Sequence, residues 1–161
     1  MQTSNDNTPT HSNASSFCCI CIFSALYEPH VGGVETYTKG IANALVKKGH
    51  RVIVVTNNTD NALEQESANG IEVVRLPCSP LLNGRFPLSK KCPSSDALWK
   101  WLDSQAIDHV VVNTRFYPLS ILGLKFARKK SIEPVLIEHG SAHLTLGNPA
   151  LDIPLNLSLI H

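Results

Sequence analysis

The sequence predicts an α/β fold in which a parallel sheet is covered by helices on both faces. Short apolar strands alternate with amphipathic helices along most of the chain, as in parallel strands joined by helical crossovers. A pair of glycines also follows the first strand and opens the first helix. The expected strands cover residues 17–24, 52–56, 71–76, 108–113 and 134–138, and the expected helices cover residues 33–48, 94–105 and 118–130.

The first strand is the continuous apolar run FCCICIF at residues 17–23. Such a run is typical of a central parallel strand that is buried on both faces. Its three cysteines are expected to pack as small apolar side chains. The chain has five cysteines, an odd number without paired ligand spacing, so neither a disulfide framework nor a metal site is expected.

The helices carry recognisable start and stop signals. Gly49 follows two lysines and is expected to close the first helix in the left-handed conformation. The second helix is expected to be capped by Ser94 or Ser95. The first helix is predicted to place Val34, Tyr37, Ile41, Ala42 and Leu45 on an inner face, and Glu35, Lys39, Asn43 and Lys47 on an outer face.

The remaining segments are expected to be connections or chain ends. Residues 57–70 are polar and residues 77–93 contain four prolines, so both are expected to be loops. Residues 1–16 are expected to be a disordered polar lead-in to one domain over residues 17–145. Residues 146–161 show no sustained periodicity and are expected to be the irregular tail of a truncated chain.

The connections also predict the order of the strands. Numbered along the chain, the five strands are expected to lie in the order 3-2-1-4-5, which reverses between the first and the fourth. Ligands of such sheets bind at the carboxyl ends of the strands near this reversal. Candidate site residues are therefore those that follow Ser24, Val112 and Ile137.

The composition narrows the function classes. The 161 residues are 43% hydrophobic and 17% charged, and the formal net charge of +1 gives no reason to expect a nucleic-acid partner. No apolar stretch approaches the roughly 20 residues of a membrane-spanning helix. The polar first residues lack the basic and apolar regions of a secretory signal. A cytoplasmic location is expected.

The turn at Gly32 and Gly33 has two readings. Two glycines at a helix start allow a diphosphate to approach free backbone N–H groups and the positive end of the helix. They would equally serve a tight turn that needs positive φ. A P-loop is excluded because no Gly-Lys-Ser/Thr follows, and a nicotinamide site is excluded because the second strand ends in Thr56-Asn57 without a ribose-binding acid.

Glu35 also has two readings. A carboxylate in the first turn favours the helix dipole and can serve as a cap. A functional Glu35 would have to face an acceptor or a neighbouring side chain, because its charge would repel a phosphate placed directly over it.

A longer stretch carries a family resemblance. Residues 29–56 read PHVGGVETYTKGIANALVKKGHRVIVVT. They resemble the start of family-four glycosyltransferases of the two-domain GT-B fold, with a Gly-Gly-x-Glu loop, a helix, Gly-His-x-Val and a strand ending in threonine. Thr114-Arg115 after the fourth strand and Glu138-His139-Gly140 at the end of the fifth strand agree with this family. The resemblance covers residues 17–145 and implies a Rossmann-like, acceptor-side N-terminal half of a GT-B architecture.

The resemblance implies roles for individual residues. Gly32 and Gly33 match the loop whose backbone lies near the donor diphosphate, and His139 matches a histidine beside the transferred sugar. The resemblance implies an acceptor-binding set on or near the strand ends, although Arg115 could equally pair with Glu138 and His139 could simply cap its strand. That set is Glu35, Asn113, Arg115 and Glu138.

The resemblance further implies a retaining hexosyltransferase with a UDP- or GDP-linked sugar as substrate, without a metal or other cofactor. The acceptor would be a glycan or a lipid-linked glycan in cell-surface polysaccharide synthesis, compatible with peripheral contact with the inner membrane face. The sequence shows no second, donor-binding domain, so the isolated chain is expected to be inactive alone. A partner chain that supplies this domain stays open, as does a non-catalytic binding module that keeps the fold.

Overall fold

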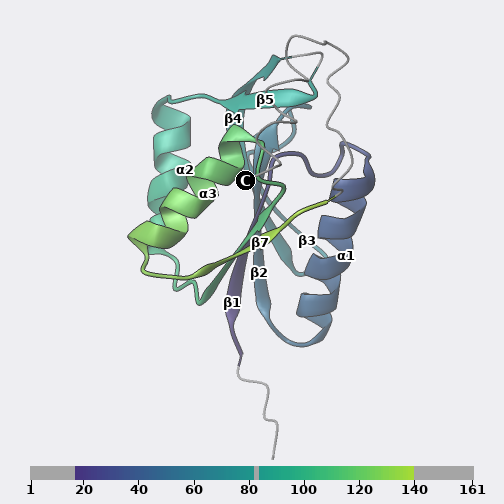
Figure 1. The fold of residues 1–161 in the computed structure, drawn as a ribbon, viewed down its shortest axis with the longest axis vertical. Coiled ribbons are helices and arrows are strands. Elements are labelled where there is room, and N and C mark those ends of the chain that lie inside the picture. The colour runs from purple at the N-terminus through teal and green to yellow at the C-terminus, as the bar shows by residue number, and fades with distance from the viewer. Residues whose placement is uncertain (1–16, 82–83, 140–161) are drawn as a thin grey trace, which may run out of the picture.

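The computed structural model describes residues 17–81 and 84–139, which form a mostly parallel sheet between two layers of helices (Figure 1). Helix α1 (Gly33–Lys47) covers one face, and helices α2 (Pro93–Ser104) and α3 (Pro118–Lys129) cover the other. The predicted α/β class is confirmed. The expected lead-in at residues 1–16 and the expected tail at residues 146–161 lie outside the described residues.

Strand β1 (Cys19–Ser24) lies at the centre of the sheet and pairs in parallel with β2 (Arg51–Asn58) and β6 (His109–Asn113). Strands β4 (Ile71–Leu81) and β7 (Pro134–Ile137) continue the parallel sheet on either side. These five strands keep the relative order predicted for them. The carboxyl ends of β1, β6 and β7 therefore meet at one edge, where the candidate site was expected.

Two further strands, β3 and β5, lie in segments that were predicted to be loops. With β3 the sheet order is β3-β4-β2-β1-β6-β7, and β5 pairs with β4 outside this order. The segment 57–70 contains β3 (Gln65–Ala68), which pairs antiparallel with β4. The segment 77–93 contains the end of β4 and β5 (Phe86–Ser89), which form a second antiparallel pair. Strand β3 is polar because it lies at an exposed edge, and prolines are tolerated in such edge pairs.

Two apolar clusters fix the helices on the sheet. One lies between β1 and the α2–α3 layer, where the Phe23 ring lies 6.2 Å from Trp99 and 5.7 Å from Phe126, centroid to centroid. Gly123 lets α3 approach closely, because a Cβ at this position would stand 2.7 Å from the Phe23 ring. The other cluster joins α1 to the opposite face of β1, β2 and β4. Cys19 and Cys21 pack in the sheet as predicted.

The orientation of α1 differs in part from the prediction. Gly49 closes the helix with φ of +88°, as expected. However, Tyr37 is 41% exposed, and Glu35 is only 6% exposed, so the inner and outer assignments of these two residues were wrong. Glu35 is buried because it contacts His30 in the loop before α1. Tyr37 instead contacts His139, which follows β7.

The start of α2 also differs from the prediction. Cys92 is the cap residue, Pro93 opens the helix, and Ser95 lies in the first turn. The Ser95 hydroxyl accepts the Cys92 backbone N–H at 3.0 Å and donates to the Cys92 carbonyl at 2.9 Å. Ser95 therefore stabilises this start from inside the helix.

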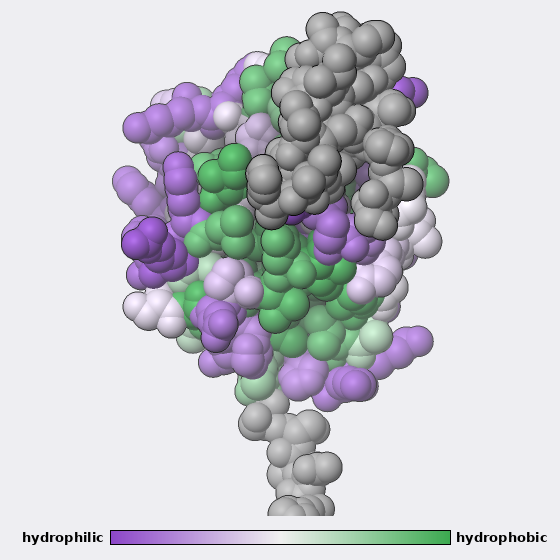
Figure 2. Space-filling model, in the orientation of Figure 1, coloured by the Kyte–Doolittle hydropathy of each residue, from purple (hydrophilic) through white to green (hydrophobic). Residues whose placement is uncertain are grey.

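Strand β7 is the outer strand of the parallel sheet within the described residues. Its Val135 and Leu136 are 56% and 45% exposed. Figure 2 shows apolar surface gathered over the region that β7 occupies in Figure 1. No helix among the described residues is long and apolar enough to cross a membrane.

Candidate functional site

The Gly32–Gly33 turn begins α1 at the carboxyl edge of the sheet. Gly32 is the cap residue, with φ of −168° and ψ of 179°, and no side chain caps this helix. Its backbone is extended, and the positive-φ glycines of the described chain lie elsewhere. The reading of this pair as a turn that needs positive φ is therefore wrong.

Close packing explains why position 32 lacks a side chain. A Cβ at Gly32 would stand 2.3 Å from Glu35 Oε2. At Gly33 the opposite holds. Among the described residues, no heavy atom other than those of the chain neighbours and of the α1 backbone would lie within 4 Å of an added Cβ. The space beside Gly33 is open at the point where the first N–H groups of α1 have no partner within the helix. This arrangement suits an anion that approaches the backbone.

Glu35 lies against this turn instead of on the helix surface. Its Oε1 is 3.3 Å from His30 Nδ1, across the loop that precedes α1. Its charge also reaches Tyr117: burial raises the pKa of the Tyr117 phenol, and the Glu35 carboxylate adds to the rise. The buried Glu35 carboxylate therefore packs against the glycine turn.

Asn113 lies in a buried polar network beneath the start of α1. The side chain is 1% exposed, and its Nδ2 donates to Thr38 Oγ1 at 2.7 Å. Thr38 in turn donates to the Val34 carbonyl at 2.7 Å and lies 3.2 Å from Ser24 Oγ. Asn113 Oδ1 has no hydrogen-bond partner within the described residues. The contacts of Asn113 therefore tie β6 and β1 to α1.

Arg115 and Glu138 form the pair that the sequence left open. Arg115 Nε lies 3.6 Å from Glu138 Oε2, and the Arg115 backbone N–H donates to the same oxygen at 3.4 Å. Both side chains are about one third exposed, and the guanidinium also lies over the Phe116 ring at 4.9 Å. Thr114, just before them, has φ of +62°. A non-glycine residue held in this region costs energy and is found preferentially at functional sites.

His139 lies at the end of β7 and contacts Tyr37 of α1. The two ring centroids are 4.4 Å apart and the ring planes are inclined at 73°. His139 Nε2 is buried and has no hydrogen-bond partner in the described part of the chain. The structure thus brings His139 to the same helix start as Gly33, which lies one turn before Tyr37. Sequence reasoning missed Tyr37 because its spacing matched the apolar face.

The described residues contain no group of three or more metal-ligating side chains. Two surface grooves of about 250 and 230 Å³ lie away from the glycine turn. One is lined by β3, β4 and Trp101, and the other lies between α2 and α3. Neither groove is lined by the glycine turn or by His139.

This chain is similar to known proteins in sequence and in fold. The model of Glycosyltransferase Family 4 matches residues 31–158, which include the glycine turn, Arg115 and His139. The chain belongs to glycosyltransferase family 4. Its fold is also similar to that of sucrose-phosphate synthase from Thermosynechococcus elongatus, a GT-B enzyme, with a TM-score of 0.56 at 15% identity over 89% of this chain and 40% of that one.

Curated relatives of this family-4 chain are longer than it is. An uncharacterized 42.6 kDa protein in the cps region of Klebsiella pneumoniae is 34% identical over 52% of this chain and 22% of that protein. One subunit of the phosphatidylinositol N-acetylglucosaminyltransferase of Homo sapiens is 32% identical over 40% and 13%. An uncharacterized glycosyltransferase of Methanocaldococcus jannaschii is 28% identical over 79% and 33%. The chain thus spans a third or less of each of these three.

Proposed function

We propose that this family-4 chain is the acceptor-side N-terminal domain of a retaining glycosyltransferase that uses a UDP- or GDP-linked hexose. The proposal rests on one observation: the open Gly33 position and the Tyr37–His139 contact lie at the same edge of the sheet. An anionic diphosphate at the helix start would place its attached sugar within reach of a histidine at a neighbouring strand end.

The electrostatic role falls to α1. Partial positive charge from its first N–H groups favours the donor diphosphate, and the same charge stabilises the diphosphate as it leaves. His139 lies beside the transferred sugar in this proposal. The His139 side chain is partly exposed, and its ring would contact the sugar.

The acceptor would meet Arg115 and Glu138, because these side chains are partly exposed and lie at the ends of β6 and β7. Asn113 and Glu35 are buried, so they would support the site and would not contact the acceptor directly. We further propose a glycan or lipid-linked acceptor in cell-surface polysaccharide synthesis, with the chain in the cytoplasm or at the inner membrane face. The human relative, whose name includes the lipid phosphatidylinositol, supports a lipid-linked class.

Turnover would also require a second, donor-side domain. The chain spans 40% of the sucrose-phosphate synthase chain, and neither groove described above is lined by the candidate site. Catalysis of this kind needs a site that excludes water around the leaving group. The remaining wall would come from a further part of the same protein or from a partner chain.

A sugar-transfer assay on the 161-residue chain tests this proposal. Radiolabelled UDP- and GDP-hexoses are offered with membrane lipid extract as acceptor, with the chain alone and with the chain joined to a family-4 donor-side domain. We expect label in the lipid or glycan fraction only in the joined protein. Robust turnover by the chain alone would contradict the requirement for a second domain, and no transfer by either protein would favour a non-catalytic binding module.

A further inference from the structure

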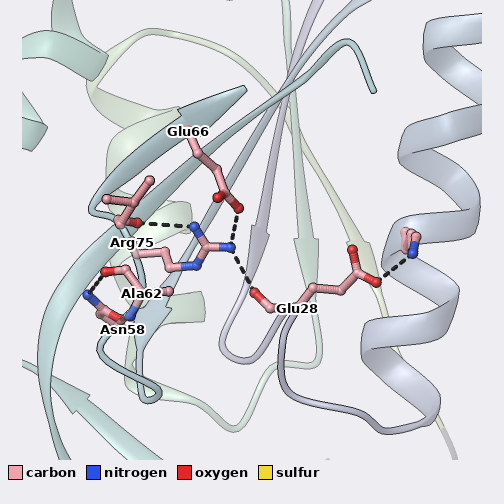
Figure 3. Close-up of polar contacts among 7 residues, drawn as sticks. Glu28, Asn58, Ala62, Glu66 and Arg75 are labelled. Atoms are coloured by element: carbon pink, nitrogen blue, oxygen red, sulfur yellow. Dashed lines mark hydrogen bonds and ion pairs between the residues drawn. The ribbon is translucent and has the colours of Figure 1, made fainter. Parts of the chain in front are cut away.

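Arg75 is a charged residue buried within the fold. It lies on β4, and its side chain is only 4% exposed. Its Nη2 donates to Glu66 Oε1 at 2.6 Å and to the Glu28 carbonyl at 2.8 Å, while Nη1 donates to the Leu63 carbonyl at 3.1 Å (Figure 3). One guanidinium thus joins β3, the connection before β3, and the loop after β1.

Stability alone does not explain this burial. Removing an arginine from water is costly, and a buried ion pair contributes little net stability compared with well-packed apolar residues. The Arg75 hydrogen bond to Glu28 links two backbone segments that are 47 residues apart. A rigid, planar guanidinium with several donors is well suited to hold such segments at a set distance.

The segment that Arg75 holds leads directly to the glycine turn. Glu28 lies in the loop just before Gly32, and its carboxylate accepts a hydrogen bond from Lys39 Nζ of α1 at 2.5 Å. The Glu28 backbone is therefore bound to β4 while its side chain is bound to α1 (Figure 3). Movement of this loop would change where the N–H groups of Gly32 and Gly33 point.

We propose that Arg75, with Glu66 as its counter-ion, is a positioning residue that fixes the glycine turn for a diphosphate ligand. The inference rests on the proposed function for the identity of the ligand, but not for the anchoring of the loop. Arg75 acts through the Glu28 carbonyl and does not touch the ligand. An anchored turn binds more tightly because less conformational freedom is lost on binding.

The chain offers a matched control in Arg51. This arginine begins β2, at the opposite end of the sheet, and also pairs with a glutamate of β4: its Nε and Nη2 donate to Glu72 at 2.6 and 2.9 Å. Nη2 also donates to Gln105 Oε1 at 2.8 Å. Arg51→Met therefore removes an arginine–glutamate pair, more exposed than that of Arg75, from the same sheet without removing a bond to the loop after β1.

The test compares R75M, R75K, E66Q and R51M in the 161-residue chain. Backbone hydrogen exchange of His30, whose N–H donates to the Tyr27 carbonyl at 3.0 Å, is measured at conditions of equal global stability. Inorganic pyrophosphate is titrated while the Gly32 and Gly33 amide signals are followed by NMR. We expect R75M to speed exchange of the His30 amide and to weaken pyrophosphate binding, each by about tenfold. R75K and E66Q should give smaller effects, and R51M should match the wild type.

Equal exchange of the loop in R75M and R51M would overturn the anchoring role. Should R75M fail to fold, the comparison of R75K with R51M decides the same question, because R75K keeps the charge beside Glu66 and removes the planar guanidinium that binds the Glu28 carbonyl. Absence of any pyrophosphate effect on the wild-type glycine signals would instead contradict the diphosphate assignment of the proposed function. In that case hydrogen exchange alone still supports or overturns the anchor.

Discussion

Tyr37 and His139 lie in edge contact, with ring centroids 4.4 Å apart, and join the first turns of α1 to the end of β7. The contact explains why an aromatic side chain that is 41% exposed stands at the start of α1. It also holds the His139 ring against α1. This relationship makes Tyr37 a residue that positions His139.

Replacing Tyr37 tests that relationship. Tyr37→Leu removes the ring contact, so the His139 ring proton shifts should move toward the values of an unstacked histidine, whereas Tyr37→Phe should retain them. Loss of an aromatic pair should weaken binding of a UDP- or GDP-hexose by about three- to tenfold. Both effects are read by NMR. Unchanged His139 shifts in Tyr37→Leu would show that the contact does not orient the histidine.

The two glycines of the turn should respond in opposite ways to alanine. Gly32→Ala places a Cβ 2.3 Å from Glu35 Oε2, at the end of a side chain that can shift, and should lower the free energy of unfolding by up to about 1 kcal/mol. Gly33→Ala meets open space and should leave stability unchanged or slightly raised. Denaturant unfolding measures both. Pyrophosphate binding should nevertheless weaken in Gly33→Ala, and unaltered binding would contradict the close approach of a ligand.

A helical glycine on the opposite side of the sheet gives a packing prediction. Gly123→Ala places a Cβ 2.7 Å from the buried Phe23 ring and should destabilise the protein by about 1–3 kcal/mol. Gly40→Ala, in α1, meets no atom within 4 Å and should stabilise it by about 0.5–1 kcal/mol. Urea unfolding of both variants provides the comparison. Equal effects would mean that α3 can move away from β1 at little cost.

Tyr27 should make the protein sensitive to alkali. Burial, aided by the charge of Glu28, raises the pKa of its phenol to about 12, above the usual value of about 10. Since the folded-state pKa is the higher one, the contribution of Tyr27 to stability is complete below about pH 10 and is lost as the pH rises toward about 12.

Denaturant unfolding between about pH 9 and 11.5 measures this loss. The wild type should lose up to about 1.4 kcal/mol per pH unit more than Tyr27→Phe above about pH 10. Tyr117, whose pKa burial also raises, is present in both proteins and cancels in the comparison. Parallel pH profiles for the two proteins would show that Tyr27 ionises as freely in the folded state as in the unfolded state.

Much of the fold follows from local patterns. The apolar run of β1 and the glycine after α1 predict their own structure, because burial on both faces and positive φ each demand particular residues. Strand β3 carries no such pattern, since Gln65–Ala68 becomes a strand only by pairing with β4. Strand β5 contains a proline and likewise depends on its partner.

The site was harder to predict than the fold. The Gly32–Gly33 turn and His139 stand at expected places because they follow strands or open a helix. The orientation of Tyr37, the burial of Glu35 and the hydrogen bonds of Arg75 depend on contacts between distant segments. Helical spacing placed Tyr37 and Glu35 on the wrong faces. An arginine in a strand gives no sign of the carbonyls that it will bind.

The most direct test of the account is an NMR titration of the ¹⁵N-labelled chain with a UDP- or GDP-hexose, up to about 10 mM because half of a site should bind weakly. Shifts should gather on Gly32, Gly33, Tyr37 and His139, and they should be lost in Gly33→Val while its far-UV spectrum stays that of the wild type. Shifts confined to another surface, or shifts that persist in Gly33→Val, would contradict the assignment of the glycine turn as the diphosphate site.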